Sequence, residues 1–156
     1  AATPVAKPAP EAPVVLPHSP GLLSRRERQE RALLAMCIAK PDEGKACLEK
    51  IEPRLLSTPL TVRAVQWLRG HLEDPAAGLD PADRELHQLI ASLALRYEPG
   101  KVGEGSIHRG FLQLELAELE DRISKTTDAA TRRDLNLERS RLVARVGTAE
   151  AEDIAR

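Results

Sequence analysis

Hydrophobic positions between residues 24 and 98 recur at intervals of three and four, the period of one face of a helix. Ser24 and Glu27 have the spacing of a capping box and predict the start of the first helix. Pro41 predicts its end, and Asp42 is the predicted cap of a short second helix that Pro53 stops. The predicted inward residues of these two helices are Leu33, Leu34, Cys37, Ile38, Cys47, Leu48 and Ile51.

Two further helices are predicted where a cap residue precedes a proline, because proline is favoured at the first helical position. Thr58-Pro59 begins one that we expect to run to about Glu73, and Asp80-Pro81 begins another that Pro99-Gly100 closes. Gly103, Gly105 and Gly110 predict a flexible join between these helices and the segment that follows. The predicted inward residues are Val62, Val65, Leu68, Leu72, Leu86, Leu89, Ile90, Leu93 and Tyr97, with Trp67 nearby.

A different pattern covers residues 106–147, where apolar residues alternate at spacings of four and three, as along the contact of two coiled helices. Residues 126–130 form a plausible turn, after which Thr131 and Asp134 are expected to cap a returning helix. Three pairs of these apolar positions share one sum of residue numbers, which an antiparallel pair requires. The predicted contact residues are Leu112, Leu116, Leu119, Ile123, Leu135, Leu142 and Val146.

The two predicted arms differ in charge. Residues 111–125 carry four acidic and two basic side chains, whereas residues 131–146 carry two acidic and five basic ones. This predicts solvent-exposed ion pairs between the arms, each worth well under ~1 kcal/mol. A second stripe on the first arm (Ile107, Phe111 and Leu114) lies away from the contact, as do Leu137 and Val143 on the second arm. These residues either pack on the upstream helices or contact a partner, and both alternatives stay open.

The composition fits this pattern, because 23 Leu and 22 Ala stand against 21 Val, Ile and Thr and three aromatic residues. Leu and Ala favour helices, whereas sheets draw on β-branched and aromatic residues. We therefore predict an all-α fold, a small helical bundle followed by a C-terminal antiparallel helical hairpin. The expected divisions are a Pro-rich flexible linker (1–23), the bundle (24–105), the hairpin (106–147) and a C-terminal tail (148–156). The six prolines within the first 20 residues and the initial Ala1 suggest a piece of a longer protein.

The sequence offers no catalytic, cofactor-binding or metal-binding constellation. The four histidines are scattered, and Cys37 and Cys47 are expected to be buried reduced thiols, which suits the cytosol. The glycines at 100–105 lack the spacing of a phosphate-binding loop. A net charge of −1 and three aromatic residues argue against direct binding of nucleic acid. No apolar run approaches the roughly 20 residues that span a bilayer.

The order of these features resembles the C-terminal, helicase-binding domain of bacterial DNA primase over roughly residues 24–146. The resemblance rests on the Pro-rich start, Glu30-Arg31-Ala32-Leu33-Leu34, the stop at Pro41, Leu55-Leu56-Ser57-Thr58-Pro59 and the terminal hairpin. The pair Leu55-Leu56 departs from the family, which often has Phe there. The resemblance implies that the hairpin docks onto the N-terminal ring of the replicative DNA helicase. It also implies that zinc and magnesium belong only to upstream domains of a primer-synthesising parent.

We therefore expect a non-catalytic, cytoplasmic interaction domain that recruits RNA primer synthesis to the replication fork, with no membrane partner and no cofactor of its own. The alternatives are the N-terminal domain of the replicative helicase itself, and a small all-α enzyme or nucleic-acid adaptor. The expected helicase contacts are off-seam apolar residues and charged residues near the predicted turn. They are Phe111, Leu114, Lys125, Arg132, Arg133 and Leu137.

Overall fold

The computed structural model describes residues 23–155, and the prediction of an all-α fold is confirmed for this part of the chain. The predicted linker therefore lies, up to residue 22, outside the described residues. The helices are α1 (Arg25–Ala39), α2 (Pro41–Lys50), the short 3-10 helix η2 (Pro53–Leu55), α3 (Pro59–His71), α4 (Arg84–Arg96), α5 (Ser106–Lys125) and α6 (Ala129–Ala155).

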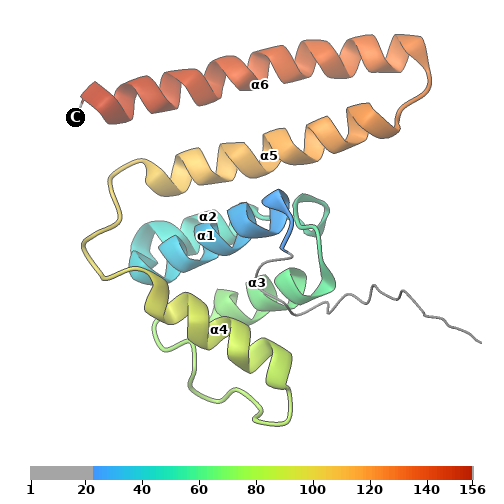
Figure 1. Cartoon of the computed structure of the whole chain (residues 1–156). Helices are drawn as coiled ribbons and strands as arrows, with labels where there is room; N and C mark the ends of the chain where they lie inside the picture. Colours follow the sequence, from blue (N-terminus) through green and yellow to red (C-terminus); the bar gives the residue numbers. More distant parts are fainter. Residues whose placement is uncertain (1–22, 156) are drawn as a thin grey trace, which may run out of the picture.

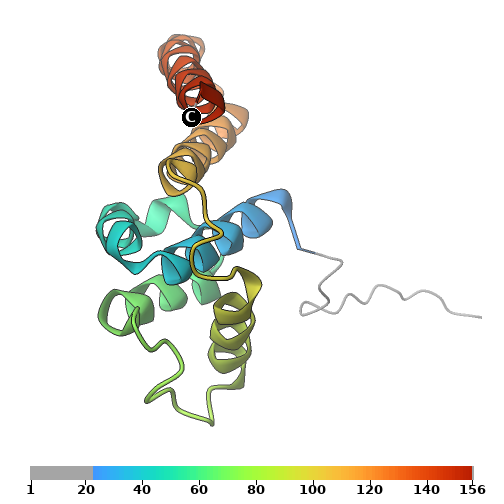
Figure 2. The ribbon, with the colours of Figure 1, turned by 90° about the vertical axis from the view of Figure 1, so that its left-hand side faces the viewer.

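The helices are stacked in layers (Figure 1). α6 is outermost and runs antiparallel along α5, which in turn lies on α1 and α2. α3 and α4 pack on the opposite side of α1 (Figure 2). α5 is thus the layer that connects the outermost helix to the rest of the fold.

Two of the predicted helix starts are confirmed by their caps. The hydroxyl of Ser24 accepts a 3.0 Å hydrogen bond from the backbone N–H of Glu27, and the hydroxyl of Thr58 accepts one of 3.2 Å from that of Thr61. Each bond satisfies one of the amides that the first turn of a helix leaves without a partner.

Two other predicted starts are wrong. α2 begins at Pro41 itself, with Lys40 as the cap, so Asp42 lies inside the first turn. α4 begins at Arg84, where the side chain of Asp83 accepts from the backbone N–H of Leu86. Asp80 is instead part of the preceding turn, because its carboxylate accepts a 2.9 Å hydrogen bond from the backbone N–H two residues later.

The buried side chains form two clusters. The larger unites α1 to α4 and includes Ile107 and Leu114 of α5. The smaller lies between α5 and α6, and contains all seven predicted contact residues together with Ala149. α5 therefore contributes one face to each cluster. The members of the smaller cluster are Leu112, Leu116, Leu119, Ile123, Leu135, Leu142, Val146 and Ala149.

Two glycines allow close helix contacts at α1. A Cβ atom on Gly44 of α2 would lie 2.3 Å from the backbone oxygen of Cys37. A Cβ atom on Gly110 would lie 3.1 Å from a methyl carbon of Leu33. The prediction that Gly110 belongs to a flexible join is wrong, because this residue lies within α5 and faces α1.

Candidate protein-interaction surface

The start of α6 is fixed by the side chain of Asp128. Its carboxylate accepts hydrogen bonds from the backbone N–H and the hydroxyl of Thr131, at 2.8 and 2.6 Å. These bonds hold the pKa of Asp128 below its usual value. The prediction that Thr131 and Asp134 cap this helix is therefore wrong: Asp128 supplies the cap, and α6 already begins at residue 129.

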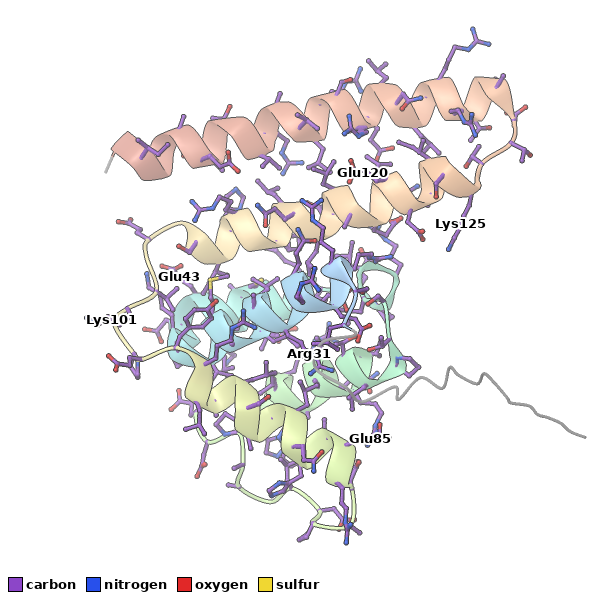
Figure 3. All side chains as sticks on the ribbon, in the orientation of Figure 1. Arg31, Glu43, Glu85, Lys101, Glu120 and Lys125 are labelled. Carbon is purple, nitrogen blue, oxygen red and sulfur yellow. The ribbon has the colours of Figure 1, made fainter. Side chains whose placement is uncertain are left out.

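Exposed ion pairs join α5 to α6, as predicted from the charges of the two arms. The guanidinium of Arg139 lies 2.9 Å from the carboxylate of Glu120, which Figure 3 labels between the two helices. Arg122 lies 3.9 Å from Glu138. All four side chains are well exposed, so each pair contributes less than about 1 kcal/mol. The smaller apolar cluster therefore supplies most of the free energy that holds α6 on α5.

Buried polar contacts fix α5 against the layer below. Glu118 of α5 is buried, and its carboxylate accepts hydrogen bonds of 2.6 Å from both Arg54 and Arg122. Nearby, the guanidinium of Arg26 in α1 lies 3.7 Å from the carboxylate of Asp121. Because α5 carries α6, these contacts also set the direction in which α6 faces outwards.

The off-seam stripe of α5 packs on the bundle, which decides between the two alternatives left open by the sequence. Leu114 is 2% exposed and belongs to the larger cluster with Ile107. Leu114 is thus not available to a partner, and its prediction as a contact residue is corrected. Phe111 is half-buried against the same cluster and keeps only part of its ring accessible.

The other four predicted contact residues remain on the surface, and two of them are engaged locally. Lys125, labelled near the end of α5 in Figure 3, lies 2.9 Å from the carboxylate of Asp121. Arg132 donates a 2.6 Å hydrogen bond to the backbone oxygen of Thr126, across the turn before α6. Arg133 is exposed, and Leu137 is 54% exposed.

α6 presents a ridge that sequence reasoning identified only in part. Arg133, Leu137 and Arg141 follow each other at four-residue spacing, and all three are exposed. Within the described chain, neither arginine forms an ion pair. We call these three residues the outer ridge. Arg141 could have been found from the same four-residue interval that relates Arg133 to Leu137.

α6 also extends further than predicted. Residues 148–155 are helical rather than a separate tail, because they contain Ala and Glu and no proline that would end the helix. This extension brings in Ile154, which is exposed, as is Val143 in the middle of the helix.

Other kinds of site find no support in residues 23–155. No group of three or more histidine, cysteine or acidic side chains in that range is arranged to hold a metal ion. No helix there is long and apolar enough to cross a membrane. Comparison with known proteins adds no relative: no protein-family model, no curated protein and no solved structure matches this chain.

Proposed function

We propose that this chain is a protein-docking module that binds the N-terminal domain of a replicative DNA helicase through α6, and so recruits RNA primer synthesis to the replication fork. The observation that carries the proposal is the outer ridge. It combines an exposed leucine with two arginines that have no ion-pair partner in the described chain. The resemblance in the order of elements to the helicase-binding domain of DNA primase supplies the identity of the partner.

The chemistry of the ridge favours a protein partner with an apolar hollow bordered by acidic side chains. Arginine is enriched at the centre of protein interfaces, and the exposed leucine between the two arginines adds apolar area that a partner can bury.

The proposal is tested by measuring binding of the 156-residue chain to the N-terminal domain of the replicative helicase from the same genome. We expect Leu137→Lys to weaken the complex by about tenfold or more, which is about 1.4 kcal/mol. Leu95→Lys is the matched control, because Leu95 is 87% exposed and belongs to α4, a helix on the opposite side of α1 from α5 and α6. Binding that is absent in the unsubstituted chain, or lost equally in both variants, would contradict the proposal.

A charge reversal tests the electrostatic part separately. We expect Arg133→Glu combined with Arg141→Glu to slow association with the helicase domain and to reduce its dependence on salt concentration. Arg139→Glu is not a suitable control, because Arg139 pairs with Glu120 inside the hairpin. Arg84→Glu, at the exposed start of α4, changes charge on the remote side and should leave the association rate unchanged.

A further inference from the structure

A groove between α2 and α5 has a cysteine in its wall. Its volume is about 380 Å³, and Cys47, Ile107 and Phe111 supply its apolar part. The charged and polar groups around it are both basic and acidic: Lys50, His108, Arg145, Glu43 and Glu115. The groove is wide enough for small solutes. Arg145 of α6, four residues after Arg141 of the outer ridge, lines one side of it.

A second thiol, that of Cys37 in α1, lies on the core side of Cys47. Gly44 lets α2 approach the backbone of Cys37 in α1, and Cys47 follows one turn after Gly44 on the same side of α2. Both thiols are free, with Cys37 0% exposed and Cys47 6% exposed. Each thiol shifts the pKa of the other, in line with the close approach of α2 to α1 at Gly44. The inner thiol is thus sealed in the core, while the outer one borders the groove.

The two thiols are chemically different as a result. The hydrogen bond donated by Cys37 lowers the pKa of Cys47 against the opposing effect of burial, and the charge of Lys50 lowers it further. The same hydrogen bond and burial raise the pKa of Cys37. The thiolate is the nucleophilic form of cysteine, so the pair has one nucleophile, Cys47, and one proton donor, Cys37.

We propose that Cys47 is a peroxide-reactive thiol at the wall of the α2–α5 groove, and that Cys37 resolves its oxidised form as a disulfide between α1 and α2. The two reacting thiols lie on α1 and α2, so the reaction itself needs none of the three residues of the outer ridge, although Arg145 of α6 lines the groove. Hydrogen peroxide, or an organic hydroperoxide small enough for the groove, is the oxidant.

Oxidation of the pair proceeds in two steps. The Cys47 thiolate attacks one peroxide oxygen and the O–O bond breaks, which leaves Cys47 as a sulfenic acid and releases hydroxide. The sulfur of Cys37 then attacks the sulfenic sulfur, forms the S–S bond and displaces hydroxide, which takes up the proton of the Cys37 thiol. The proton that Cys47 lost on ionising neutralises the hydroxide of the first step, so two thiols and one hydrogen peroxide give one disulfide and two waters. An organic hydroperoxide leaves as an alkoxide instead and gives one alcohol and one water. The thiols lose two electrons, and the peroxide gains them.

The test uses the reduced 156-residue chain and hydrogen peroxide, followed by intact-mass measurement without reductant. We expect the mass to fall by two hydrogens, and peptide mapping to link residues 37 and 47. In Cys37→Ser, the mass should instead rise by one oxygen, on a Cys47 sulfenic acid that dimedone traps. In Cys47→Ser, Cys37 should stay unmodified, because it does not border the groove.

Alkylation with iodoacetamide gives a second measurement that needs no variant. We expect Cys47 of the unsubstituted folded chain to be labelled first, and Cys37 only after unfolding in urea. The rate of Cys47 alkylation at neutral pH should fall in Cys37→Ala, because alanine has no donor to stabilise the Cys47 thiolate. Circular dichroism checks that each variant is folded. The proposal is overturned if peroxide leaves the folded chain unchanged, if Cys37 reacts first, or if the disulfide joins two copies.

Discussion

Arg54 in η2 donates a 2.6 Å hydrogen bond to the carboxylate of Glu118 in α5, a residue 64 positions further along the chain. Glu118 is one of the few buried charged residues in the described part of the chain, and Arg122 on its own helix supplies the second partner. Arg54 is the partner of the two that lies outside α5, so any other placement of α5 would cost the buried carboxylate its hydrogen bond to the layer below. The direction of the outer ridge therefore depends on this contact.

Removing the Glu118 carboxylate should loosen the attachment of α5. We expect Glu118→Ala to lower the free energy of unfolding by about 1–3 kcal/mol, since it removes two charge-assisted hydrogen bonds and leaves a small cavity. Urea denaturation measures the change through a lower midpoint. Glu120→Ala is the matched control on the same helix, because its pair with Arg139 is exposed and should cost less than about 1 kcal/mol. Equal losses in the two variants would contradict the role given to Glu118.

A glycine-to-alanine substitution should change stability in opposite directions at Gly44 and at Gly147. Gly44→Ala places a Cβ atom 2.3 Å from a backbone oxygen of α1, and should destabilise the fold by about 1–3 kcal/mol as overpacking does. Gly147→Ala meets nothing within 4 Å in α6, and should stabilise by about 0.5–1 kcal/mol through helix propensity. Thermal unfolding of both variants decides the matter. A stabilising Gly44→Ala would show that α1 and α2 do not approach as described.

Two adjacent residues of α6 separate the buried face from the exposed one. Leu142 is 7% exposed in the α5–α6 cluster, whereas Val143 is 41% exposed. We expect Leu142→Ala to cost about 2–5 kcal/mol and Val143→Ala about 0.5 kcal/mol or less. Chemical denaturation followed by circular dichroism measures both. If Val143 were the costlier position, the register of α6 on α5 would have to be different.

The cap of α6 predicts a dependence of stability on acid pH. The folded-state pKa of Asp128 is lowered, so its contribution is fully present above the ordinary aspartate pKa and disappears as pH falls through the lowered folded-state value. The unsubstituted protein should therefore be more stable than Asp128→Ala at neutral pH, and this difference in stability should shrink as the pH falls through the lowered pKa of Asp128. Denaturation midpoints measured from neutral to acid pH test the expectation. A constant difference between the two proteins would mean that the ionised carboxylate is not the cap.

Much of the fold could be predicted because its signals are local. Ser24 and Thr58 cap their helices through atoms three residues away, and the heptad-like spacing of Leu112 to Ile123 defines one face without knowledge of the rest. The start of α4 was missed because Asp80 and Asp83 both have the chemistry of a cap. Only the surrounding packing decides that the turn uses the first and the helix uses the second.

The candidate surface was predicted less completely, because exposure depends on contacts between distant segments. Phe111 and Leu114 have the spacing of an exposed apolar stripe, yet α1 and α2 cover them to different degrees. Leu137 has no such cover and stays on the surface. A residue's position on a helix can be read from the chain, whereas the identity of the neighbour opposite it requires the arrangement of all the helices.

The shared position of α5 has a consequence for how the molecule opens. The smaller cluster can separate without disturbing the larger one, since α6 packs chiefly on the side of α5 that faces away from the bundle. Amide protons of α6 should then exchange with solvent deuterium through a local opening, faster than those of α1, whose exchange needs global unfolding. The docking helix proposed above could then detach from α5 while the bundle beneath stays folded.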